Sequence, residues 1–75
     1  MRVTVKLIGP LIYEGGFSEK VVELPGPVTA GELSAHVKIK KKRPTIITRN
    51  GRAVADGDAI EDGDRVVISH IYSGG

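Results

Sequence analysis

The segment DGDRVVISHIYSGG, residues 62–75, contains a turn, a strand and a glycine pair in immediate succession. The first three residues are typical of a tight turn, because Gly tolerates positive φ and Asp side chains accept hydrogen bonds from nearby backbone N–H groups. Residues 65–71 are then rich in apolar β-branched residues, and among these Val66 and Ile68 share one face. We therefore predict a strand that turns these two side chains into the core.

The N-terminal residues show the same alternation. Val3, Val5 and Leu7 alternate with polar residues, which is typical of a strand with one buried face. Glycine and proline at positions 9 and 10 end this strand, and we expect a loose return up to a second strand at residues 20–24. The two strands are predicted to form a wide hairpin.

A helix is predicted after this hairpin. Thr29 and Glu32 have the spacing of a capping box, and Val28 and Leu33 have the spacing of a hydrophobic staple around it. Leu33 and Val37 are four residues apart and would share the buried face of the helix. We expect only two to three turns.

The rest of the chain is predicted to be mostly strand. A β-branched run at residues 45–48 precedes Asn50-Gly51, a strong signal for a type I′ hairpin turn, and residues 52–54 return as an edge strand. Ile60 lies between two Asp-Gly-Asp turns as an anchor into the core. The expected core consists of Val3, Val5, Leu7, Val22, Leu24, Leu33, Ile47, Ile60, Val66 and Ile68.

This order of elements predicts an α+β fold, a mixed sheet of four to five strands packed on one short helix. A right-handed crossover places the last strand parallel to the first, at the centre of the sheet. At 75 residues the chain is a single domain, which we expect to be monomeric when free, and it has no cysteine to supply a thiol. Its apolar runs are too short for a membrane span, so a cytoplasmic protein is expected.

Four segments together resemble the sulfur-carrier proteins of molybdopterin and thiamin synthesis. They are the first strand running into Gly9-Pro10-Leu11, the helix entry at residues 29–33, the turn into the last strand at residues 62–66, and the final Gly74-Gly75. The resemblance covers essentially the whole chain and implies a β-grasp fold, as in ubiquitin. Ile12 and Arg49 depart from it, because an arginine and an apolar residue are usual at these two positions.

The resemblance also implies the chemistry. The carboxylate of Gly75 would be adenylated by an E1-like adenylyltransferase that uses Mg-ATP, and sulfur would then displace AMP to leave a thiocarboxylate. A sulfur-accepting synthase would take that sulfur in a cofactor, thiamin or tRNA thiolation pathway. The chain itself would bind no cofactor or metal and would not be an enzyme.

The predicted organisation is a β-grasp domain over residues 1–71 and a flexible tail over residues 72–75. Gly74 and Gly75 have no side chains to obstruct a narrow channel in a partner, and four extended residues reach about 13 Å. Ile71, Tyr72 and Ser73 are expected to contact that partner. The alternatives are that the glycine pair is an ordinary frayed end and that Ile71 and Tyr72 only pack at the sheet edge.

Two other functions remain open from the sequence. A protein modifier would use the same activated Gly75 to form an isopeptide bond with a lysine. A nucleic-acid-binding module would use the basic cluster Lys38–Arg43, which we instead interpret as a solvated loop after the helix, because it has no interleaved aromatic residue to stack on bases. His36 and His70 lie far apart in sequence without a third ligand, and we expect both at the surface or its boundary.

Overall fold

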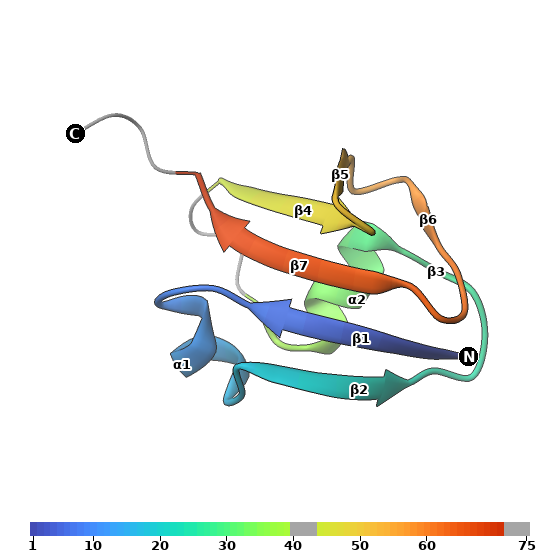
Figure 1. Ribbon diagram of the computed structural model, residues 1–75, viewed down its shortest axis with the longest axis horizontal. Helices are drawn as coiled ribbons and strands as arrows, with labels where there is room; N and C mark the ends of the chain where they lie inside the picture. The colour runs from blue at the N-terminus through green and yellow to red at the C-terminus, as the bar shows by residue number, and fades with distance from the viewer. Residues whose placement is uncertain (40–43, 72–75) are drawn as a thin grey trace.

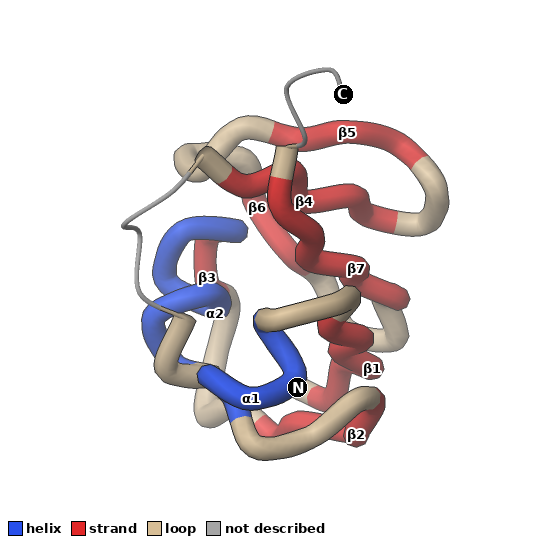
Figure 2. The backbone as a smooth tube through the Cα atoms, turned by 90° about the vertical axis from the view of Figure 1, so that its left-hand side faces the viewer, coloured by secondary structure: helices blue, strands red, loops and turns tan. Residues whose placement is uncertain are grey.

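The computed structural model describes residues 1–39 and 44–71. Its elements, in chain order, are β1 (Arg2–Leu7), α1 (Leu11–Gly15), β2 (Glu19–Glu23), β3 (Val28–Thr29), α2 (Ala30–His36), β4 (Thr45–Arg49), β5 (Arg52–Val54), β6 (Ala59–Ile60) and β7 (Arg65–His70). A five-stranded sheet has the order β2-β1-β7-β4-β5, and β3 pairs with β6 in a separate two-stranded ribbon. The helices lie on one side of the large sheet (Figure 2).

The central strand is β7, as predicted. It runs parallel to β1, with Val5 beside Val66, and antiparallel to β4, with Ile47 beside Ile68. β1 and β7 therefore end at the same end of the sheet, and Met1 lies at the opposite end (Figure 1). The predicted strand at residues 65–71 is one residue too long, because β7 ends at His70.

The hydrophobic core lies between the sheet and α2. All ten residues of the predicted core are buried, and the alternation in β1 has the predicted register. Val37 is also buried, as its spacing from Leu33 predicted. The structure adds Leu11, Ala30 and Ile39 to this core.

Both ends of α2 are capped. At its start the Glu32 N–H donates to Thr29 Oγ1 (3.1 Å) and the Thr29 N–H donates to Glu32 Oε1 (2.9 Å), which confirms the predicted capping box. At its end the N–H groups of Lys38 and Ile39 donate to the carbonyls of Ala35 (3.0 Å) and Ser34 (3.1 Å). This is the bonding pattern of a Schellman cap, with Lys38 in the left-handed conformation at φ 66°.

Ser34 gives a stability prediction. Its side chain is fully buried on α2, and its hydroxyl has no hydrogen-bond partner among the described residues. A buried hydroxyl without a partner costs about 1–3 kcal/mol, and alanine also favours helix more than serine does. We expect Ser34→Ala to raise the free energy of unfolding by about 1 kcal/mol in urea titrations. A fall in stability would show that the hydroxyl has a stabilising role.

The loose return expected between β1 and β2 contains a second short helix, α1, that was not predicted. α1 spans only five residues, and its N-cap residue, Pro10, provides no side-chain cap. Leu11, its first residue, is fully buried, and Ile12, one of the two departures from the family pattern, packs against the core. Burial of these side chains holds a turn of helix that is too short to show periodicity.

A polar cluster lies at the start of β7, at the end of the sheet opposite the one where β7 ends. Asp64 is buried and accepts hydrogen bonds from Arg49 Nε, Asn50 Nδ2 (2.9 Å) and the Glu61 N–H (2.7 Å). Asn50 and Gly51 both have positive φ, 51° and 85°, as the predicted type I′ turn requires. Arg49, at a position where the resemblance implied an apolar residue, is the ion-pair partner of Asp64.

Burial alone would raise the pKa of the Asp64 carboxyl. The hydrogen bonds from Arg49, the Glu61 N–H and Asn50, together with the charge of Arg49, outweigh that effect and hold the pKa below its ordinary value. The sequence predicted only a turn here, and the structure shows that Asp64 also links β4 to β7.

Candidate functional site

The candidate site is the point where the chain leaves the sheet after β7. The Ile71 N–H donates to the Pro44 carbonyl oxygen (3.1 Å), so the backbone stays bonded to the neighbouring segment one residue beyond the strand. The Ile71 side chain is 49% exposed. Of the predicted site residues only Ile71 is described, because Tyr72, Ser73, Gly74 and Gly75 lie outside the described residues.

Two further exposed isoleucines lie at this end of the sheet. The Ile8 N–H, just after β1, donates to the Ile68 carbonyl (3.1 Å), and Ile46 on β4 lies opposite Ser69. Ile8 is 36% exposed and Ile46 39%. Since β1 and β4 flank β7, the two isoleucines are about 10 Å apart across the sheet. We call Ile8, Ile46 and Ile71 the exit patch.

One further exposed apolar side chain belongs to a helix at this end of the sheet. Tyr13 on α1, the helix that follows β1 at this end, is 89% exposed. Four of the five exposed large apolar side chains in the described residues thus lie at this end, and only Val21 is elsewhere. Apolar surface gathered in one region of a small soluble domain is typical of a protein contact.

Sequence reasoning found Ile71 and missed Ile8, Ile46 and Tyr13. The signal for the two isoleucines was present, because both occupy outward positions in the alternation of their strands. What the sequence alone does not display is that β1, β4 and β7 bring these positions to one end of the sheet. Tyr13 was missed together with α1.

The two histidines do not form a site. His36 is exposed at the end of α2, and His70 is half-buried with no hydrogen-bond partner for Nδ1 among the described residues, so both are at the surface or its boundary as predicted. Within residues 1–39 and 44–71, no three His, Asp or Glu side chains are grouped as metal ligands.

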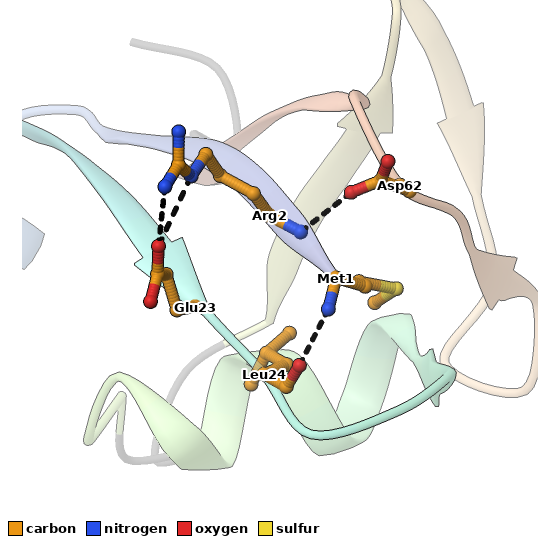
Figure 3. A pocket seen from close by; sticks show the side chains of 5 residues that line it. All are labelled: Met1, Arg2, Glu23, Leu24 and Asp62. Carbon is orange, nitrogen blue, oxygen red and sulfur yellow. Dashed lines mark hydrogen bonds and ion pairs between the residues drawn. The ribbon is translucent and has the colours of Figure 1, made fainter.

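A broad hollow of about 550 Å³ lies at the opposite end of the sheet and is lined by Met1, Arg2, Glu23, Leu24 and Asp62 (Figure 3). Its polar groups bond to one another. Arg2 forms an ion pair with Glu23 (2.5 Å), the Arg2 N–H donates to Asp62 Oδ1 (2.7 Å), and the Met1 nitrogen donates to the Leu24 carbonyl (2.6 Å). These contacts hold β1, β2 and the turn before β7 together, and we do not interpret the hollow as a binding site.

Solved structures place this architecture among β-grasp proteins. SAMP1 from Haloferax volcanii is 25% identical, with a TM-score of 0.75 and 100% of both chains covered. A protein from Pyrococcus furiosus described as molybdopterin converting factor, subunit 1, is 24% identical, with a TM-score of 0.78 over 93% of this chain and 97% of that one. The complex of subunits 1 and 2 of the molybdopterin-converting factor from Helicobacter pylori contains a chain that is 20% identical, with a TM-score of 0.66 and both chains fully covered.

The chain belongs to the ThiS family, whose model matches residues 5–75. The match includes the whole sheet from within β1 onward and extends through the glycine pair. No curated protein sequence matches the chain significantly. Among the described residues, no helix has the length and apolarity that a membrane crossing requires.

Proposed function

We propose that the chain is a sulfur carrier whose reactive group is the Gly75 carboxylate. The observation that carries the proposal is that the ThiS family match extends through Gly74 and Gly75, a few residues after a strand that ends beside exposed apolar surface. The body of the protein provides a surface for docking and the glycine pair provides the group that reacts.

The chemistry requires activation, because a free carboxylate expels oxygen poorly. A partner E1-like adenylyltransferase transfers AMP from Mg-ATP to a Gly75 oxygen and releases pyrophosphate. A sulfur nucleophile, as sulfide or an enzyme persulfide, then attacks the carbonyl carbon and AMP leaves. Sulfide leaves a thiocarboxylate on Gly75 directly. A persulfide instead leaves an acyl disulfide, and a thiol must then attack the enzyme's sulfur atom, forming a disulfide and releasing the thiocarboxylate. A synthase uses this thiocarboxylate as its sulfur source.

Docking is assigned to the exit patch. Ile8 directly follows β1 and Ile46 lies on β4, the two strands that flank β7, and Ile71 directly follows β7, so a partner that covers all three also fixes where residues 72–75 start. The complex of the two Helicobacter pylori subunits supports the proposal, because a chain of this fold there assembles with a protein partner.

The proposal is tested by intact-mass spectrometry. The purified chain is incubated with an adenylyltransferase that activates ThiS-family proteins, Mg-ATP and sulfide. We expect a gain of about 16 Da, the mass difference between sulfur and oxygen. The gain should require ATP. An unchanged mass with an adenylyltransferase from the same organism would contradict the proposal.

Protein modification is a second candidate, because SAMP1, at 25% identity, is a small archaeal modifier protein. It shares the adenylation of Gly75, but a lysine amine attacks the activated carbonyl and forms an isopeptide bond. Digestion of host proteins should then yield lysines that carry the C-terminal residues of this chain. Such adducts without any thiocarboxylate would favour this candidate over the sulfur carrier.

Ile46→Asp tests the exit patch. A charge at the centre of an apolar contact must be desolvated on binding, so we expect affinity for the adenylyltransferase to fall by about tenfold. Ala59→Asp is the matched control, since Ala59 is exposed on β6 in the separate ribbon. Calorimetric titration measures both. Equal affinities for the two variants would show that the enzyme docks elsewhere.

A further inference from the structure

The outer edge of β2 is a second candidate for an interaction. β2 is the outermost strand on one side of the sheet (Figure 1). In the part of the chain that the structure describes, no strand pairs with this edge. An uncovered strand edge is a template for a further strand, because its backbone donors and acceptors lack protein partners.

The pairing with β1 shows which backbone groups of β2 are available. Met1 and Leu24 exchange two hydrogen bonds, of 2.6 and 2.8 Å, so they are a bonded pair of this antiparallel ladder. Bonded pairs recur at every second residue. The N–H and C=O groups that point away from β1 are therefore those of Glu19, Val21 and Glu23.

A small hollow lies beside this edge, on the side of the sheet that faces α2. Its volume is about 130 Å³, and it is lined by residues in or next to α1, β2 and the end of α2, namely Gly15, Phe17, Lys20, His36, Val37 and Lys38. Ligand pockets usually occupy about 300–1,000 Å³, so this hollow is too small for a cofactor and has room for a side chain. Every second side chain of a strand added to β2 would point to this side of the sheet, and one of them could reach the hollow.

The rim of the hollow is basic. Lys20 Nζ lies 4.9 Å from the centroid of the Phe17 ring, which holds the ammonium group beside the opening. Lys38 also lines the hollow and occupies the left-handed position that ends α2, at φ 66°. The rim therefore complements an acidic side chain.

The opposite side of the same edge has a different character. Val21 is 54% exposed there, and its neighbours Glu19 and Glu23 are ion-paired with Arg65 (2.8 Å) and Arg2 (2.5 Å). A strand added to this edge would therefore have Lys20 and Lys38 on one side of the sheet. On the other side it would have Val21, flanked by two ion-paired glutamates.

We propose that β2 binds an extended segment of a partner protein in which acidic and apolar residues alternate. The segment extends the sheet by bonding to Glu19, Val21 and Glu23, with its acidic side chains toward Lys20 and Lys38 and its apolar side chains beside Val21. A second copy of this chain fits poorly, because antiparallel pairing centred on Val21 sets Glu19 opposite the copy's Glu23.

Synthetic peptides test the proposal on the full chain. The probes are a fluorescent ten-residue peptide of alternating valine and aspartate, and matched peptides with lysine for aspartate or with a central proline. We expect the first to bind at least tenfold more tightly than the others by fluorescence anisotropy at low salt. In hydrogen exchange, the amides of Glu19, Val21 and Glu23 should become protected on binding. Protection elsewhere, or equal affinity for all three peptides, would overturn the proposal.

Two pairs of variants separate backbone pairing from side-chain contact. Val21→Pro removes an outward N–H that does not bond to β1, and we expect peptide binding to be at least tenfold weaker. Val21→Ala retains that N–H, and its affinity for the peptide should fall much less. Lys20→Glu combined with Lys38→Glu should reverse the preference toward the lysine peptide. Urea titrations confirm that each variant is folded. Equal effects of the two Val21 variants, or dimerisation of the free chain through β2, would contradict the proposal.

This proposal stands apart from the proposed function. A chain without Gly75 should bind the valine and aspartate peptide with unchanged affinity, although it is expected to lose sulfur loading. Loss of peptide binding on that deletion would show that the C-terminal residues, and not the β2 edge, form the contact.

Discussion

Deletion of Gly75 should reduce sulfur loading of the chain by at least about 100-fold. The new terminal carboxylate would stop about 3.3 Å short of the nucleotide, and a displacement of only 1 Å can lower a reaction rate by about 100-fold. The measurement is the rate of the mass gain in the presence of the adenylyltransferase, Mg-ATP and sulfide. Binding to the enzyme should change much less than the rate, because the exit patch is intact.

Arg52→Ala is the control for this experiment, since Arg52 is exposed on the edge strand β5, distant from the exit patch. Replacing Gly74 with valine should also slow loading, because a β-branched side chain narrows the conformations available to the tail and adds bulk in a channel. If the deleted chain acquired sulfur at its new terminus at the wild-type rate, the position of the carboxylate would be irrelevant and the proposed mechanism would fail.

Most of the fold was predictable because its signals are local. The alternation of Val3, Val5 and Leu7 fixes which face of β1 is buried, and a shift by one residue would have reversed it. The capping box at Thr29 and the turn at Asn50-Gly51 depend on residues that are adjacent or three apart. The central position of β7 follows from the handedness of the crossover between parallel strands.

The parts that sequence reasoning missed depend on residues that are distant in the chain. α1 has no periodicity to detect, and burial of Leu11 against the sheet holds it. Asp64 has the local pattern of a turn residue, and its burial depends on Arg49, fifteen residues earlier. The exit patch likewise forms only where three strands end or begin together. The role of Gly75 follows from family resemblance and stays a prediction.

Asp64→Asn should lower the free energy of unfolding by about 2 kcal/mol at neutral pH. The substitution retains the shape of the side chain, so a cavity does not contribute. The substitution replaces one carboxylate oxygen, an acceptor, by an NH₂ group, a donor. In the wild-type protein Arg49, the Glu61 N–H and the Asn50 amide all donate to Asp64, so in either orientation the new NH₂ group faces another donor. Urea titration of both proteins at pH 7 measures the difference.

The pH dependence identifies the carboxylate as the cause. The pKa of Asp64 in the folded state is lowered, so its contribution to stability is present above the unfolded value of about 3.9 and is lost as pH falls through the folded pKa. The wild-type protein should therefore lose stability on acidification below about pH 4 more steeply than Asp64→Asn does. The pKa of Glu23 is also lowered, chiefly by its hydrogen bond from Arg2, but Glu23 is exposed, and Glu23→Gln should leave most of the acid dependence in place. The opposite result, in which Glu23→Gln removes the acid dependence and Asp64→Asn does not, would contradict this assignment. The loss of stability at low pH would then come from the Arg2–Glu23 ion pair between β1 and β2, and not from the buried Asp64 carboxylate between β4 and β7.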